Sequence, residues 1–114
     1  MSVRITGDML ALDRKLVRRI NRLATELGKA APDQQLDLQV KIAEEFDQVR
    51  GHRVRCELVA NLSAKRQIIV REAHKKAEES IDTAFTGLRT KLRRLRIRSL
   101  GKAGAADALR ATGT

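Results

Sequence analysis

The alternation of hydrophobic and polar positions changes character from one segment of the chain to the next. Near the N-terminus, Val3 and Ile5 alternate with Arg4 and Thr6, and Gly7 follows. A period of two residues is typical of a strand with one buried face and one solvated face. We therefore predict a short first strand that ends at the glycine.

A helix is predicted after this strand. Asp13 fits an N-cap, because its carboxylate can accept hydrogen bonds from the unpaired amides of a first helical turn. The following apolar residues form one stripe at helical spacing: Leu16, Val17, Ile20, Leu23, Ala24 and Leu27. We expect the helix to close at Gly28 and a loop to span 29–33, which contains the single proline, Pro32.

Three further segments alternate between apolar and polar residues, as strands with one wet face do. These strands are predicted at 36–42, 53–62 and 67–71. Turns are expected between them, at 46–52, where Gly51 lies, and at 61–65.

The most informative stretch is the last predicted helix, which begins near 74–76 and includes Glu79 to Leu100. Its apolar residues form one stripe that must pack on something apolar: Ala77, Ile81, Ala84, Phe85, Leu88, Leu92 and Leu95. At about 100° per residue, cations border the stripe on both sides: Arg89, Arg93 and Arg96 on one, Lys91, Arg94 and Arg98 on the other. No acid occurs between Asp82 and Asp107. Because like charges at this spacing repel each other, the series indicates a polyanionic ligand.

The predicted order is β-α-β-β-β-α, which indicates the α+β class. Each helix has one apolar stripe and each strand one apolar face, so we expect two layers, with both helices on one face of a four-stranded sheet. Residues 1–100 would form this domain. Residues 101–114 are rich in Gly and Ala with one Leu, and we expect them to be a flexible C-terminal tail.

Charge narrows the function classes. The 114 residues carry a formal net charge of +10, with a sequence pI near 10.8. Such a basic small domain points first to nucleic acid. Phe46 and Phe85 are the only aromatic residues, so a base-stacking platform is disfavoured and recognition of backbone and shape is favoured.

The candidate RNA-binding residues come from three places: the last helix, its start, and the face of the first helix opposite its stripe. That face also carries Arg19, and its charge is partly balanced by Asp13 and Glu26. The candidates are Arg89, Lys91, Arg93, Arg94, Arg96, Arg98, Lys75, Lys76, Arg14, Lys15, Arg18 and Arg22.

Other classes of protein lack support in the sequence. His52 and His74 have no acid or cysteine at ligand spacing, so we expect surface histidines and no metal site. Cys56 lies on an apolar strand face and is expected to be a core residue without a disulfide partner. We expect no enzyme activity, no catalytic residue, no cofactor and no small-molecule substrate.

A membrane partner is not expected either. No apolar run reaches the roughly 18 residues that a spanning helix needs, and the N-terminus lacks a secretory signal. A membrane-surface role would require a free leucine stripe, whereas the strands need that stripe as their cover. We expect a cytoplasmic protein.

Two short motifs stand at matching ends of the predicted domain. Residues 5–7 read Ile-Thr-Gly at the end of the first strand, and residues 80–82 read Ser-Ile-Asp near the start of the last helix, before Leu88, Leu92 and the basic series. In these motifs, over roughly residues 2–98, the chain resembles the family of ribosome hibernation-promoting factors and ribosome-associated inhibitors, also described as sigma-54 modulation or S30AE-like proteins.

The resemblance implies a fold similar to double-stranded RNA-binding domains. It also implies binding to the rRNA of the small ribosomal subunit, where mRNA and tRNA would lie, and silencing of idle bacterial ribosomes under stress or in stationary phase. We expect a monomer away from the ribosome. Long family members pair ribosomes through an additional C-terminal domain, for which this chain ends too early, so we expect that any role in pairing would need a second factor.

Some positions depart from the family pattern. Lys76 and Glu78 stand where members commonly carry Asp and Tyr, Ser80 precedes Ile81, and Thr90 replaces a usual Arg. Arg94 and Arg96 match the family's basic series. A generic protein that binds double-stranded nucleic acid remains the alternative, because contact of Arg with phosphate looks the same in both cases.

Overall fold

The computed structural model describes residues 2–30, 35–62 and 66–108, with side chains described as far as Leu95. The elements along the chain are β1 (Ser2–Gly7), a single 3-10 turn η1 (Met9–Leu12), α1 (Arg14–Ala30), β2 (Asp37–Asp47), β3 (Gly51–Asn61), β4 (Gln67–His74) and α2 (Ala77–Ala108). The predicted order β-α-β-β-β-α is confirmed.

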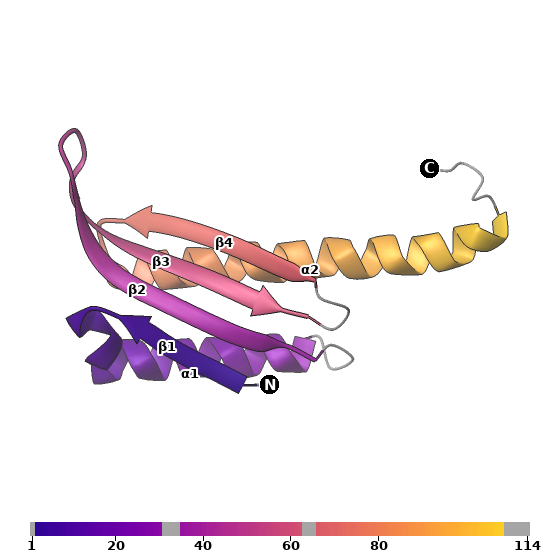
Figure 1. Ribbon diagram of the computed structural model, residues 1–114, viewed down its shortest axis with the longest axis horizontal. Coiled ribbons are helices and arrows are strands. Elements are labelled where there is room, and N and C mark those ends of the chain that lie inside the picture. The colour runs from indigo at the N-terminus through magenta and orange to yellow at the C-terminus, as the bar shows by residue number, and fades with distance from the viewer. Residues whose placement is uncertain (1, 31–34, 63–65, 109–114) are drawn as a thin grey trace.

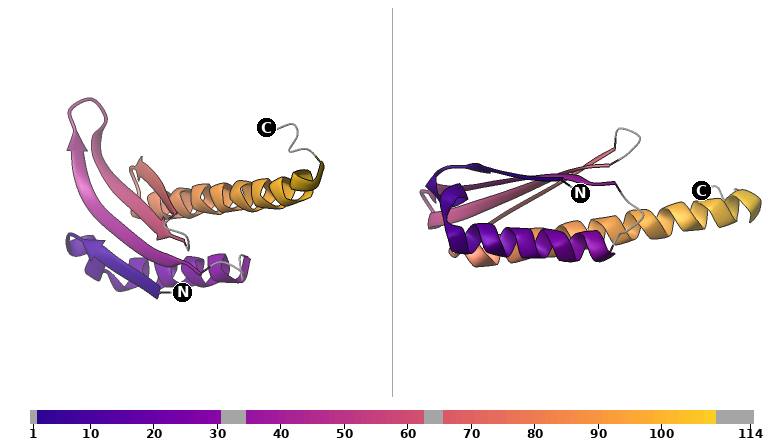
Figure 2. Two further views of the ribbon diagram at one scale, coloured as in Figure 1. Left: turned by 45° about the vertical axis from the view of Figure 1, so that its right-hand side comes forward. Right: turned by 90° about the horizontal axis from the view of Figure 1, so that it is seen from below.

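The four strands form one mixed sheet in the order β1-β2-β3-β4. β1 runs parallel to β2, and the two following pairs are antiparallel. α1 and α2 lie side by side under the same face of this sheet (Figures 1 and 2). The expected two-layer α+β architecture is therefore confirmed.

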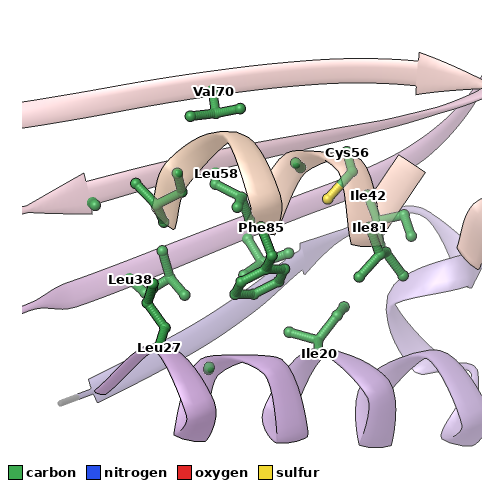
Figure 3. Close-up of a cluster of buried hydrophobic side chains, with 14 of the residues drawn as sticks. Ile20, Leu27, Leu38, Ile42, Cys56, Leu58, Val70, Ile81 and Phe85 are labelled. Atoms are coloured by element: carbon green, nitrogen blue, oxygen red, sulfur yellow. The ribbon is translucent and has the colours of Figure 1, made fainter. Parts of the chain in front are cut away.

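The core lies between the sheet and the two helices. Alternate residues of the strands point toward the helices, among them Leu38, Ile42, Leu58 and Val70, while α2 inserts Phe85 into the middle of the cluster (Figure 3). Burial of a continuous apolar layer of this kind is the main stabilising contribution to folding.

Cys56 belongs to this core, as expected. Its side chain is fully buried. Burial raises the pKa of the thiol to about 12, because the thiolate would lose its hydration. The group therefore acts as a small apolar residue and not as a nucleophile.

The glycine of the first motif has a clear physical role. Gly7 has φ +137, and a Cβ at this position would lie 1.9 Å from the carbonyl oxygen of Ile42 on β2. The next residue, Asp8, accepts hydrogen bonds from the amides of Leu10 at 2.9 Å and Glu44 at 2.7 Å. Only glycine permits this approach, so the motif fixes the exit of the chain from the sheet toward α1.

Asp13 caps α1 as predicted, with its carboxylate accepting from the amides of Lys15 and Leu16. Several boundaries nevertheless differ from expectation. α1 continues past Gly28 to Ala30. The expected turn at 46–52 is shorter, because β2 and β3 pair as far as Asp47 and Gly51. Cross-strand hydrogen bonds extend the ladder beyond the apolar alternation, which ends at Ile42.

The last helix is longer than expected. α2 does not end at Leu100 but continues to Ala108, and it extends past the end of the sheet (Figure 1). The first part of the expected tail is thus helical, and its flexibility stays a prediction. Residues 109–114 lie outside the described residues.

Candidate nucleic-acid interface

The start of α2 is anchored to the sheet by one buried polar side chain. The hydroxyl of Ser80 donates to the carbonyl of Val54 on β3 at 2.6 Å and accepts from the amide of His74 at the end of β4 at 3.0 Å. Ser80 is fully buried. The serine that departs from the family pattern therefore fastens the first turn of the basic helix to two strands.

The apolar stripe then fixes how α2 is rotated. Ile81, Phe85, Leu88 and Leu92 are buried against the sheet and α1. Gly87 faces Val70 so closely that an added Cβ would lie 3.3 Å from its side chain. Because the helix cannot turn about its axis, its cations are held on its two borders and its outer face.

The two predicted borders point in different directions. Arg89 lies toward α1, with its Nη2 4.0 Å from the Glu26 carboxylate. Lys91 lies toward the sheet edge, where its Nζ donates to the carbonyl of Ile69 on β4 at 3.3 Å. Arg93 and Arg94 are exposed. Arg96 and Arg98 lie on the helical backbone of α2, and their side chains fall outside those described.

A second ion pair joins the two helices. Arg19 of α1 donates from Nε and Nη2 to the two carboxylate oxygens of Asp82 on α2, at 2.7 and 2.5 Å. These hydrogen bonds hold the pKa of Asp82 below its ordinary value, so the pair stays ionised near neutral pH. The Arg19–Asp82 and Glu26–Arg89 pairs lie seven residues apart on each helix, so α1 and α2 run parallel.

The α1 candidates are gathered on one surface. Arg14, Lys15, Arg18 and Arg22 are exposed. Three of them, together with Arg19, line an open hollow of about 440 Å³.

The candidate list omitted Arg19, which the helical spacing places on the face of α1 opposite its apolar stripe. Its side chain is 32% exposed, because it turns toward α2 and Asp82. One feature of the sequence indicates these pairs: opposite charges stand seven residues apart at 19 and 26 and again at 82 and 89. This spacing predicts two ion pairs between the helices only once the helices are known to be parallel.

Lys75 and Lys76 occupy the bend between β4 and α2, where both are exposed. Glu78 and Glu79 follow in the first turn of the helix. Acids favour the positive end of a helix, but here they also offset the two lysines. This end of α2 is therefore less strongly cationic than the stretch around Arg93.

The far face of the sheet is different in character. There Arg55 lies 3.3 Å from Glu45 and Arg71 lies 2.5 Å from Glu57, so both signs alternate across the strands. On the surface of the helix layer positive charge dominates, because the acids Asp82 and Glu26 are each paired with an arginine. An extended polyanion is accommodated by the helix layer rather than by the far face.

The histidines do have acidic neighbours, contrary to expectation. His52 lies 3.2 Å from Glu44, and His74 lies 3.0 Å from Glu72. Residue spacing does not show the contact of His52 with Glu44, which lies across the β2–β3 hairpin, whereas Glu72 lies only two residues before His74 on β4, a spacing that the sequence does show. Within the part of the chain that the structure describes, no group of three potential ligands could hold a metal ion.

Comparison with known proteins agrees with the resemblance seen in the sequence. Residues 3–99 match the sequence model of the family described as sigma 54 modulation protein / S30EA ribosomal protein. The chain belongs to this family. Family membership identifies it as a ribosome-associated protein and not an enzyme. Comparison with curated proteins gives no significant match.

Solved structures share the fold. A ribosomal subunit interface protein from Coxiella burnetii has a TM-score of 0.70 at 10% identity, over 85% of this chain and 99% of that chain. The Protein Y N-terminal domain of Thermus thermophilus has a TM-score of 0.62 at 19% identity, over 83% of this chain and 99% of that chain. At these identities the likeness shows the fold alone.

None of the helices in the described residues is long and apolar enough to cross a bilayer. On α2 the leucines that would have to enter lipid are instead buried, Leu88 completely and Leu92 nearly so.

Proposed function

We propose that this family member binds rRNA of the small ribosomal subunit in the region where mRNA and tRNA lie, and thereby silences idle ribosomes under stress or in stationary phase. The observation that carries the proposal is the helix layer, in which two parallel helices present cations while Asp82 and Glu26, which face the neighbouring helix, are paired with arginines. Because ribosomal RNA is the proposed ligand, we propose that the protein acts in the cytoplasm.

The geometry suits a phosphate backbone. Guanidinium groups bind phosphate oxygens through two parallel hydrogen bonds, and α2 carries them at the exposed positions of Arg93 and Arg94. α1 adds the exposed cations around its hollow. A rigid pair of helices keeps these groups at fixed separations, which reduces the entropy lost on binding.

Membership in the family favours the ribosome over other polyanions. The Coxiella burnetii relative in fold is named a ribosomal subunit interface protein. A protein that occupied the same place would sit where the two subunits meet, and there it would exclude mRNA and tRNA.

A generic binder of double-stranded nucleic acid is the second candidate. It is favoured by the absence of an aromatic residue from the basic series on α2, since cations alone contact phosphates without reading bases. On this alternative, any duplex with the same charge density would compete equally well.

Competition separates the two candidates. Purified small subunits carrying the labelled protein are challenged with duplex RNA or DNA at equal phosphate concentration, and the released protein is measured by sedimentation. We expect the protein to stay on the subunits and an excess of it to stop a translation extract. Release by the duplex, or translation at full rate, would leave only the generic alternative.

A further inference from the structure

The hollow on α1 contains one cation that differs from its neighbours. Lys15, Arg18 and Arg22 are exposed, whereas Arg19 is half-buried and fixed by Asp82 of the other helix. A free Lys or Arg loses rotamer freedom when it captures an anion. Arg19 has already been ordered by folding, so it contributes a donor at lower entropic cost.

We propose that Asp82 is a positioning residue that holds Arg19 as the fixed donor of a phosphate-binding site in this hollow. Arg has five N–H groups, and Asp82 takes two of them, so three remain for an anion. The inference rests on the proposed function for the source of the phosphate, which is the rRNA backbone. A free diphosphate presents the same chemistry.

Two opposite effects of Asp82 must be distinguished. As a negative charge it repels a phosphate in the hollow, so removing it should tighten binding by electrostatics alone. As the anchor of Arg19 it should weaken binding when removed. The first effect is present whether or not position 19 carries the guanidinium, whereas the second requires it.

A double-mutant cycle measures the second effect. Inorganic pyrophosphate is titrated by calorimetry into the wild type, Asp82→Asn, Arg19→Gln and the double variant. Fixing one long side chain changes affinity by roughly threefold to tenfold. We therefore compare the change in pyrophosphate affinity caused by Asp82→Asn in two backgrounds, and expect it to be less favourable by that factor when Arg19 is present than when Arg19 is replaced by Gln. An equal effect in both backgrounds overturns the proposal.

Two variants separate positioning from general helix packing. Glu26→Gln breaks the Arg89–Glu26 ion pair between α1 and α2 without altering the lining of the hollow, so it should not lower pyrophosphate affinity, and the loss of its negative charge acts only to tighten binding. Asp82→Glu keeps a carboxylate and should preserve the coupling to Arg19. If Glu26→Gln lowers the affinity as much as Asp82→Asn does, the effect comes from packing and the proposal is wrong.

A spectroscopic measurement reports on Arg19 directly. In the wild type, the Nε–Hε resonance of Arg19 should be visible before pyrophosphate is added and should shift during the titration. In Asp82→Asn it should be broadened or lost before any ligand is present. If this resonance does not shift when pyrophosphate is added to the wild type, Arg19 does not bind the anion and the proposed site is wrong.

The same four proteins are then tested on small ribosomal subunits. If the cycle shows no coupling while the wild type binds subunits, this inference fails and the proposed function stands. If the coupling is present with pyrophosphate but the wild type does not bind subunits, the proposed function fails and the site takes a free phosphate compound.

Discussion

The hydroxyl of Ser80 donates a 2.6 Å hydrogen bond to the carbonyl of Val54, and through it the basic helix is tied to the centre of the sheet. We expect Ser80→Ala to lower the free energy of unfolding by about 1–3 kcal/mol, because the Val54 carbonyl and the His74 amide both lose a partner. Chemical denaturation measures this loss.

Ser2→Ala is the matched control for this prediction. The hydroxyl of Ser2 also donates a hydrogen bond, at 2.7 Å to Asp37, but both groups are exposed and water can replace the bond. A similar loss of stability in both variants would mean that burial of Ser80 does not matter.

The glycine of the first motif gives a second prediction. Gly7→Ala should destabilise the domain severely, since a Cβ would overlap the Ile42 carbonyl. Gly51→Ala is the control, because its φ of +80 is strained for alanine but nothing lies within 4 Å of the added atom. It should cost only about 1–2 kcal/mol. Equal thermal melting temperatures for the two variants would contradict the overlap.

The ion pair between the helices predicts a dependence of stability on pH. The folded protein holds the pKa of Asp82 below the ordinary value of 3.8, chiefly through the hydrogen bonds from Arg19. A carboxyl with a lowered folded pKa stabilises the fold above its unfolded pKa, and this contribution is lost as the pH falls through the folded pKa. The side chain is 43% exposed, so the contribution is reduced by solvent screening.

We therefore expect Asp82→Asn to be less stable than the wild type at pH 7 and the difference to shrink in acid, below the ordinary pKa of the carboxyl. Denaturation curves at several pH values test this. Asp37→Asn is the control, since Asp37 is an exposed aspartate whose carboxylate accepts a hydrogen bond from the Ser2 hydroxyl. A difference that stays constant down to strong acid would show that the charge of Asp82 has no part in it.

The sequence predicted the elements because their periods are local properties of the chain. The alternation around Val40 and the stripe through Leu88 each require only a few neighbouring residues, and both end up in the core. Element boundaries depended on contacts further away. The long hairpin is paired up to Asp47 and Gly51 by hydrogen bonds that no apolar pattern shows.

The candidate interface was predictable only in part, because it too depends on contacts between residues that are distant in the sequence. The borders of α2 followed from 100° per residue, and Arg89 and Lys91 do lie on different sides. Which border faces α1 depends on how the helix packs. The pairing of Arg19 with Asp82 joins residues 63 positions apart, and it depends on the mutual register of two helices that the sequence alone does not give.

The C-terminal part of α2 provides a further prediction. Residues 101–114 contain one leucine, and the family match ends at residue 99. We expect a chain cut after Leu100 to keep its melting temperature and its affinity for small subunits, because little apolar surface is lost. Sedimentation with subunits and circular dichroism measure both. A truncated chain that unfolds, or binds more than about tenfold more weakly, would contradict the flexible-tail expectation.

The last prediction concerns the exposed arginines on α2. Arg93→Gln and Arg94→Gln remove one cation each without touching the buried stripe. Each phosphate contact that is lost lowers the slope of log affinity against log salt by roughly one, so the double variant should lose about two units of slope. Its affinity should fall most at low salt and approach that of the wild type as salt rises, because released counterions drive the lost part of the binding.

Arg4→Gln is the matched control for the double variant. Arg4 is exposed on β1, where its neighbours Val3 and Ile5 pack toward the core and it therefore points away from the helix layer. Arg4→Gln removes one positive charge and the double variant removes two, so an effect of net charge alone would appear in the control at half the size. Binding to small subunits is measured at several salt concentrations. If the double variant gives a line parallel to that of the wild type, Arg93 and Arg94 do not contact phosphates and the interface lies elsewhere on the protein.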